Sequence, residues 1–318
     1  MLPKSIFVAG HRGMVGSAVC RRLEIEKNVE TITRCRADLD LGNAAEVRHF
    51  FEQSRPQAVI LAAALVGGIH ANNAYPVEFM TENLRVELAV IEAAFATGVS
   101  RLLFLGSTCI YPRLAPQPIS EDQLLTSPLE KTNEAYALAK IVGLKLCEYY
   151  RREHGVIYHS AMPTNLYGKN DNYHPANSHV LPALLSRFHA AKESGLEEVV
   201  IWGTGSPRRE FLYVDDLADA LVHLIGLADP PDWVNVGSGV DLTILELAHK
   251  IAKTVGYQGK ISTDPSKPDG TPRKQTNISL IRSTGWTPKT SLDQGLEETY
   301  KAFLSEKLAG TLRTSQNK

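Results

Sequence analysis

Short apolar runs alternate with longer amphipathic segments through the first half of the chain. The apolar runs predict buried β-strands at 5–10, 29–34, 57–63, 101–106 and 156–162. The amphipathic segments between them predict helices at 15–27, 44–54, 77–98 and 134–154. Because strands that alternate with helices pair in parallel, this pattern predicts an α/β fold with a doubly wound parallel sheet.

The pattern changes after Pro163. The strand candidates become short, at 199–202 and 233–236, and helices are predicted at 180–193, 214–227, 244–255 and 291–308. We expect residues 1–165 to form the sheet domain, with segments near 210–240 returning to it. Residues 166–318 are expected to form mainly a smaller mixed α/β substrate domain.

Composition narrows the class of protein. The 318 residues include 34 Lys and Arg against 35 Asp and Glu, a net charge of −1, which gives no support for a nucleic-acid or anionic-membrane partner. The four cysteines, Cys20, Cys35, Cys109 and Cys147, form no CxxC pair, so neither a zinc site nor a disulfide framework is indicated. The longest apolar stretch, 58–69, is too short to span a bilayer. We expect a cytoplasmic protein without a bound metal.

The first predicted strand runs into a glycine-rich turn. Gly10, Gly13 and Gly16 stand where a tight turn, the close approach of a pyrophosphate and a helix–strand contact each favour glycine. Amide groups at the start of the following helix would face the phosphates. The turn therefore predicts a dinucleotide site. The residues between the glycines are also expected to contact the cofactor: His11, Arg12, Met14 and Val15.

The end of the second predicted strand decides between NAD and NADP. An acidic residue there would bind the ribose 2′-hydroxyl, whereas Arg34 and Arg36 occupy this part of the chain. Arginine forks, together with Arg12 in the glycine turn, suit a 2′-phosphate. NADP(H) is therefore the expected cofactor, and Asp38 or Asp40 could still contact the adenosine.

A tyrosine and a lysine four residues apart mark the predicted helix at 134–154. Tyr136 and Lys140 lie on one face of this helix, and Ser107 directly follows the fourth strand, at the crevice where parallel sheets bind ligands. A carbonyl that receives a hydride needs a proton donor. Free tyrosine has a pKa of about 10, which a nearby ammonium would lower. We therefore expect Tyr136 to donate the proton, assisted by Lys140 and Ser107.

Together these motifs resemble the extended short-chain dehydrogenase/reductase family over essentially the whole chain. The similar segments are 10–16, 61–64, Ser107, Tyr136 with Lys140, and 163–168. The resemblance implies a Rossmann-type sheet domain that binds NADP(H). It also implies cofactor contacts from Leu39, Leu41, Leu105, Gly106, Ser107, Lys140, Pro163, Asn165, Leu166 and His179.

Several longer stretches resemble one branch of that family. They are 9–18, 66–73, 106–112, 172–179 and 267–273. Enzymes of this branch epimerise GDP-4-dehydro-6-deoxy-D-mannose at C3 and C5 and reduce it at C4 with NADPH. The resemblance implies that Cys109 and His179 move the protons of the epimerisation. We favour Cys109 as base and His179 as acid, and the reverse assignment stays open.

The resemblance places the GDP-sugar against the later segments. Arg187, Arg209 and Lys267 could hold the diphosphate, Trp202 could stack on guanine, and Asp269 could accept hydrogen bonds. Analogy with the family also implies a homodimer through the two long predicted helices, 77–98 and 134–154. The alternatives are another sugar-nucleotide epimerase or reductase of this family, and a non-catalytic protein that binds NADPH.

Overall fold

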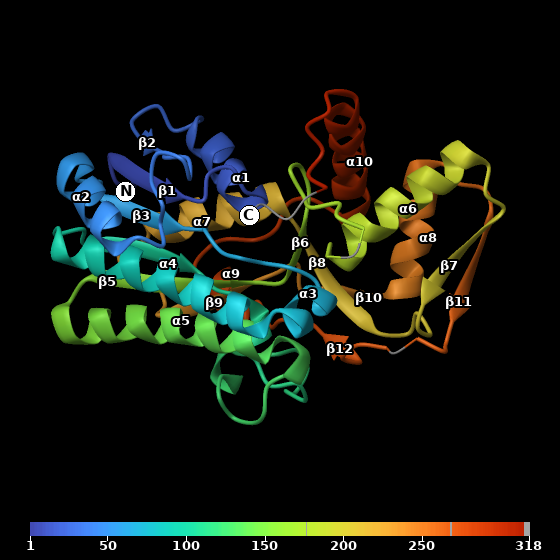
Figure 1. The fold of residues 1–318 in the computed structure, drawn as a ribbon. Helices are drawn as coiled ribbons and strands as arrows, with labels where there is room; N and C mark the ends of the chain where they lie inside the picture. Colours follow the sequence, from blue (N-terminus) through green and yellow to red (C-terminus); the bar gives the residue numbers. More distant parts are fainter. Residues whose placement is uncertain (176, 268, 315–318) are drawn as a thin grey trace.

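Six parallel strands form the central sheet of the computed structural model, which describes residues 1–175, 177–267 and 269–314 (Figure 1). From one edge to the other, the strands are β2 (Glu30–Ile32), β1 (Ser5–Ala9), β3 (Ala58–Leu61), β4 (Arg101–Leu105), β5 (Ile157–Pro163) and β9 (Trp233–Val236). Each neighbouring pair is parallel. The carboxyl ends of the strands therefore meet at one edge, where such sheets bind their ligands.

Helices cover both faces of this sheet (Figure 1). One face carries α2 (Ala44–Ser54), α4 (Pro76–Ala96) and α5 (Glu134–His154), with the short α3 (Ile69–Ala74) preceding α4. The other carries α1 (Met14–Leu23), α7 (Val214–Gly226) and α9 (Ser279–Ser283). Two separate apolar clusters fill these interfaces. All four residues of β3 are buried, as expected for a strand with helices on both sides.

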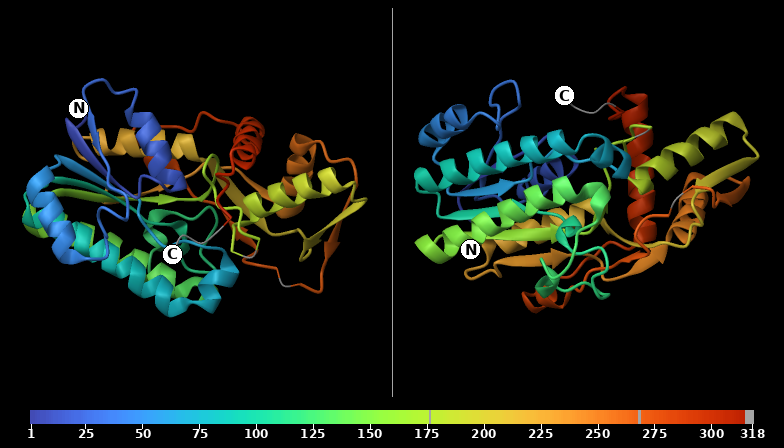
Figure 2. Two further views of the ribbon diagram at one scale, coloured as in Figure 1. Left: turned by 45° about the horizontal axis from the view of Figure 1, so that its top comes forward. Right: turned by 60° about the horizontal axis from the view of Figure 1, so that its bottom comes forward.

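Figure 2 shows the smaller lobe beside the sheet lobe. It has an apolar core of its own. Its parallel strands are β7 (Glu198–Trp202) and β11 (Lys260–Asp264). Its helices are α6 (Val180–Ser194), α8 (Ile244–Val255) and α10 (Leu292–Leu308), of which α8 contacts both others. Phe188 and Leu247 are fully buried in this core, so apolar packing holds the lobe together.

A four-stranded sheet lies between the two lobes (Figure 1). In it β8 (Arg208–Tyr213) pairs with β6 (Asn165–Tyr167), β10 (Asp241–Thr243) and β12 (Arg273–Lys274). The buried Glu210 of β8 accepts hydrogen bonds from Thr276 and from the Gly239 amide, which fixes the chain on both sides of β8. Among the described residues, the fold also contains the 3-10 turns η1 (Thr108–Ile110), η2 (Glu121–Gln123) and η3 (Lys131–Asn133).

The doubly wound α/β class predicted from the sequence is confirmed. Helix α5 has the predicted bounds, whereas α1 ends at Leu23 instead of residue 27, and Ile25 beyond its end is 71% exposed. The sequence pattern did not predict β6, β8, β10, β11, β12, α3 and α9. Most of these are short, and β8 and β11 carry charged residues at their ends. Within the part of the chain that the structure describes, no helix is long and apolar enough to cross a membrane.

Candidate active site

The glycine turn closes tightly between β1 and α1. Gly10 has φ of +87°, and a Cβ there would lie 2.7 Å from the Ala63 nitrogen. A Cβ on Gly16 would lie 2.1 Å from the Gly10 carbonyl oxygen, so neither position accepts a side chain. The Gly13 amide donates to Gly10 O at 2.9 Å, and Gly13 caps the N-terminus of α1. The helix start and the bare backbone therefore fit a pyrophosphate.

One cavity of about 2260 Å³ runs from this turn into the smaller lobe. It is large enough for a dinucleotide and a second nucleotide-sized ligand together. All but two of the residues expected at the site line it; the exceptions are Asp38 and Lys267. The expected cofactor residues that line it are Gly10, His11, Arg12, Gly13, Met14, Val15, Gly16, Arg36, Leu39, Asp40, Leu41, Leu105, Gly106, Ser107, Lys140, Pro163, Asn165, Leu166 and His179.

The segment after β2 brings two arginines to one end of the cavity. Arg34 and Arg36 both line it; the Arg34 guanidinium also donates to Thr33 O and lies 5.2 Å from the Phe50 ring centre. Asp38 accepts a hydrogen bond from the Cys35 thiol at 2.7 Å and does not line the cavity. This end of the cavity is cationic, as a 2′-phosphate requires.

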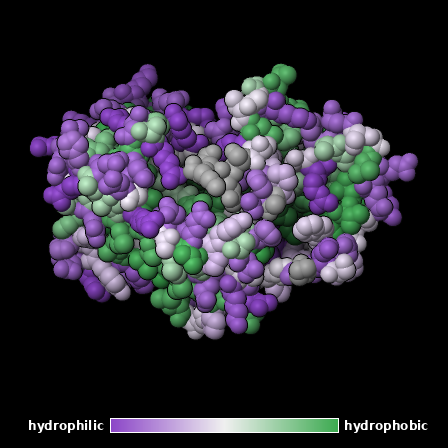
Figure 3. Space-filling view, in the orientation of Figure 1, coloured by the Kyte–Doolittle hydropathy of each residue, from purple (hydrophilic) through white to green (hydrophobic). Residues whose placement is uncertain are grey.

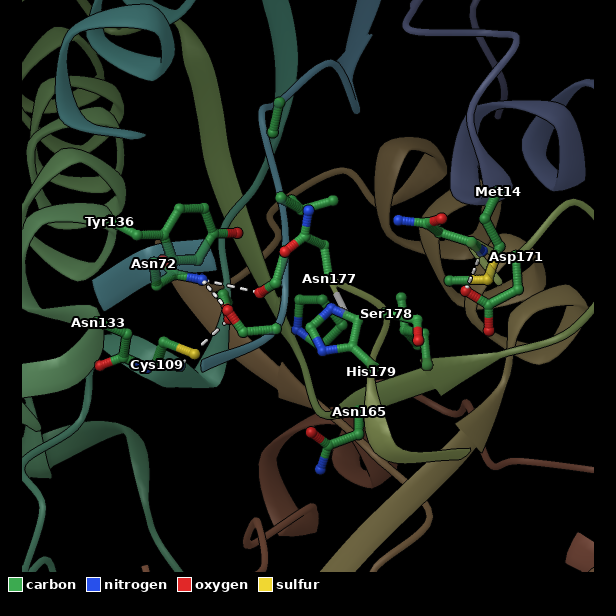
Figure 4. Close-up of a pocket in the computed structure, with 18 of the residues that line it drawn as sticks. Met14, Asn72, Cys109, Asn133, Tyr136, Asn165, Asp171, Asn177, Ser178 and His179 are labelled. Carbon is green, nitrogen blue, oxygen red and sulfur yellow. Dashed lines mark hydrogen bonds between the residues drawn. The ribbon is translucent and has the colours of Figure 1, made fainter. Parts of the chain in front are cut away.

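Ser107, Tyr136 and Lys140 meet where β4 ends. Ser107 caps η1 by accepting from the Cys109 amide at 3.2 Å, and it hydrogen-bonds Tyr136. Lys140 donates to the carbonyl of Leu105 at 3.1 Å, and its Nζ lies 5.8 Å from the centre of the Tyr136 ring. Figure 4 shows the Tyr136 hydroxyl pointing into the cavity. A proton donor therefore stands beside the expected cofactor site.

The electrostatics of Tyr136 differ from the expectation. Burial raises the pKa of its hydroxyl, with smaller contributions from Cys109 and Glu87, and the Ser107 hydrogen bond only partly opposes this. Lys140 was expected to lower this pKa, but its ammonium is paired with Glu87 at 3.1 Å instead. The phenol is therefore protonated, which is the form that donates a proton during a reduction.

Cys109 and His179 approach the same space from different lobes (Figure 4). Cys109 lies in η1, and His179 is the N-cap of α6 without a side-chain capping bond. Lys274 of β12 donates to Cys109 Sγ at 3.5 Å. Burial, and secondarily Lys274, lower the pKa of His179, so its imidazole is neutral near pH 7.

A backbone contact between the lobes holds the segment before His179. The Gly68 amide donates to Asn177 O at 3.0 Å, and a Cβ on Gly68 would lie 2.8 Å from Ser178 O. Asn72 fixes the Gly68 side of this contact by donating to Gly67 O and Gly68 O at 2.7 and 3.1 Å (Figure 4). His179 is thus positioned relative to the sheet lobe by this contact.

The smaller lobe supplies cationic and aromatic groups at the far end of the cavity. Trp202 is 71% exposed, and the Lys267 ammonium lies 5.9 Å from its ring centre. Arg187 donates to Val200 O, and Arg209 donates to Thr271 O at 2.6 Å, while burial lowers the pKa of both guanidinium groups. Asp269 accepts from Thr204 at 2.7 Å and so orders the loop beside the strand. An exposed indole with nearby guanidinium groups suits a nucleoside diphosphate.

Sequence reasoning missed three polar residues of this site: Asn72, Glu87 and Lys274. Glu87 is 1% exposed within a long helix, but buried glutamates are rare, so the sequence alone gave no reason to single it out. Lys274 stands in a two-residue strand with no motif of its own. Only the three-dimensional packing brings Glu87 to Lys140 and Lys274 to Cys109.

Comparison with known proteins agrees with this geometry. Residues 6–237 match the NAD dependent epimerase/dehydratase family. The chain is 57% identical over 299 residues to GDP-L-fucose synthase 1 of Arabidopsis thaliana, covering 94% of this chain and 93% of the relative. It is 52% identical over 314 residues to the GDP-L-fucose synthase of Escherichia coli K12, covering 96% and 98%. A crystal structure of a GDP-L-fucose synthetase from Naegleria fowleri bound to NADP superposes with a TM-score of 0.88 at 27% identity, covering 98% and 97%. The chain therefore belongs to the NAD dependent epimerase/dehydratase family.

Proposed function

We propose that this protein converts GDP-4-dehydro-6-deoxy-D-mannose into GDP-L-fucose, by epimerisation at C3 and C5 and NADPH-dependent reduction at C4. One observation carries the proposal: a thiol and an imidazole share a cavity with the Ser107, Tyr136 and Lys140 trio. A plain reductase needs only the trio, whereas an epimerisation needs further proton carriers. Relatives at 52% and 57% identity are named GDP-L-fucose synthases, which supports the same assignment.

NADPH supplies the hydride for C4. In the proposed complex, the glycine turn and the start of α1 bind its pyrophosphate, and Arg12 and Arg36 bind its 2′-phosphate. Arg187 and Arg209 bind the diphosphate of the GDP-sugar, and Trp202 stacks on the guanine. Lys267 approaches the same indole from outside the cavity and can attract the diphosphate electrostatically.

The epimerisation uses the acidity of protons beside a ketone. C3 and C5 both flank the C4 carbonyl, so removal of either proton gives an enolate whose oxygen Tyr136 and Ser107 stabilise by hydrogen bonds. We assign Cys109 as the base on one face and His179 as the acid on the other. Because His179 is neutral in the structure, it must gain a proton before it donates one.

The reduction follows at the same carbonyl. C4 receives the hydride while Tyr136 gives its proton to the C4 oxygen, so one NADPH and one proton are consumed for each sugar reduced. Lys140 stabilises the phenolate that remains. The substrate thus stays in one place for both reactions, because they share this oxygen.

We also propose the domain division at residues 165 and 166, with the segment near 210–240 returning to the sheet domain. The joining of β9 to the main sheet supports it. The four cysteines are free thiols, which supports a reducing compartment, the cytoplasm.

We also propose a homodimer that forms through α4 and α5, because both helices expose apolar side chains on their outward faces. Leu138, Val142 and Tyr149 of α5 are 39%, 44% and 45% exposed, and their spacing puts them on one face. Leu88 of α4 is 39% exposed as well. Figure 3 shows apolar side chains on this part of the surface. A helix pair with a second apolar face suits an isologous contact with a second copy.

The proposed reaction is tested by mixing the protein with NADPH and GDP-4-dehydro-6-deoxy-D-mannose, following the absorbance of NADPH and identifying the sugar by NMR. Stoichiometric NADPH loss with GDP-L-fucose as product is expected. NADPH loss with an unepimerised sugar would remove Cys109 and His179 from the mechanism. Epimerisation without NADPH loss would identify a sugar-nucleotide epimerase instead.

The Tyr136→Phe variant is expected to slow NADPH oxidation by at least about 100-fold, because it removes only the proton donor. The matched control is Tyr158→Phe, whose hydroxyl bonds Val99 O away from the cavity and whose loss should leave the rate unchanged. Equal rates in Tyr136→Phe and the wild type would overturn the role of Tyr136.

The Cys109→Ser variant is expected to slow deuterium exchange at C3 and C5 by about 100-fold, since a hydroxyl is a far weaker base than a thiolate. NMR in deuterated water measures this exchange. Cys20→Ser is the control, because Cys20 lies on α1 and does not line the cavity. Exchange at the wild-type rate in Cys109→Ser would exclude this thiol as the base.

Sedimentation equilibrium tests the dimer. The wild type is expected to sediment as a dimer and Val142→Glu as a monomer, because the charge would be buried without a partner. Leu304→Glu places the same charge on the exposed face of α10 and should stay dimeric. A monomeric wild type would contradict the proposal.

A further inference from the structure

A buried glutamate faces Lys140 from the neighbouring helix. Glu87 lies on α4 and Lys140 on α5, and each residue is 1% exposed. Their charged groups are 3.1 Å apart, and among the described residues this is the one ion pair with both side chains fully buried. Apart from Lys140, neither Glu87 oxygen has a hydrogen-bond partner among the described residues. The lysine ammonium is therefore what balances the charge of this carboxylate.

The interior is shaped to hold the Glu87 carboxylate. A Cβ on Gly143 would lie 2.8 Å from Glu87 Oε2 and 2.5 Å from Phe104 Cζ, so α4 and α5 approach each other only because this residue is glycine. The titratable groups around the carboxylate are Lys140, Tyr136 and Cys147, all on α5. From β4, Phe104 contributes an uncharged ring, 4.7 Å from the Lys140 Nζ.

Burial and pairing act on the two charges in opposite directions. Burial raises the pKa of the Glu87 carboxyl, and the Lys140 ammonium opposes this. An ammonium in the interior is costly unless an opposite charge touches it, and removing one partner leaves the other uncompensated. Each group therefore supplies the counter-charge that holds the other in place.

We infer that Glu87 is a positioning residue for the reduction, which supplies the counter-charge of the Lys140 ammonium and holds it at the Leu105 carbonyl beside Tyr136. The inference rests on the proposed roles of Tyr136 and Lys140. Once Tyr136 has given its proton to the substrate, an ammonium stabilises the phenolate and a neutral amine does not. Glu87 does not line the cavity, so it acts on the reaction only through Lys140.

The test compares Glu87→Gln with the wild type by the pH dependence of kcat for NADPH oxidation. Without its counter-charge, Lys140 releases its proton at lower pH, so the alkaline limb of the profile is expected to move down by about one pH unit or more. Glu87→Asp keeps the carboxylate but places it farther from Lys140. Its alkaline limb should therefore lie between those of Glu87→Gln and the wild type. Glu92→Gln makes the same chemical change at an exposed position of α4 and should match the wild type.

A stability measurement that needs no substrate completes the test. Thermal unfolding is measured for Glu87→Gln, Lys140→Met and the double variant. The loss of Tm in the double variant is expected to be smaller than the sum of the losses in the two single variants. Additive losses would overturn the inference, as would a Glu87→Gln profile that coincides with the wild type. If the losses are not additive but the wild type does not consume NADPH, the proposed function is wrong, whereas the coupling between Glu87 and Lys140 is confirmed. If Glu87→Gln does not fold, the pH profile and the thermal unfolding are measured on Glu87→Asp instead.

Discussion

One charge held in the protein interior governs this site: the ammonium of Lys140. It lies between α4, α5 and β4, against the Phe104 ring, the Leu105 carbonyl and the Glu87 carboxylate. The close approach of the two helices at Gly143 is needed to enclose it. Because an interior ammonium is tolerated only with such partners, the packing of the sheet lobe and the chemistry of the site cannot be separated.

The second half of the site comes from the other lobe. His179 lies at the start of α6, and the contact between Gly68 and Asn177 relates its segment to the sheet. Lys274 reaches Cys109 from the strand that pairs with β8. In the proposed reaction, Tyr136 and Ser107 of the sheet lobe act on the C4 oxygen, and His179 of the smaller lobe acts on the carbon atoms beside it. The cavity between the lobes is therefore where the two reactions take place.

Local spacing predicted the parts of the site that lie close together in sequence. The glycine turn and the Tyr136–Lys140 pair follow from residues three or four apart, so one turn or one helix face places them. Glu87 and Lys274 each contact a residue of another helix or strand that is distant in sequence, and only tertiary packing brings such residues together. The same limit explains Tyr136, whose pKa follows burial more than the nearby lysine. Asp38 differs, because its carboxylate accepts a local hydrogen bond from the Cys35 thiol three residues away and it does not line the cavity.

The central claim is that one carbonyl serves both proton exchange and hydride transfer. The most direct test is to run the complete reaction in deuterated water with unlabelled NADPH and to locate the deuterium in the sugar by NMR. The account predicts GDP-L-fucose with deuterium at C3 and C5 and hydrogen at C4, since the cofactor provides only the last. Hydrogen retained at C3 and C5, or deuterium at C4, would contradict it.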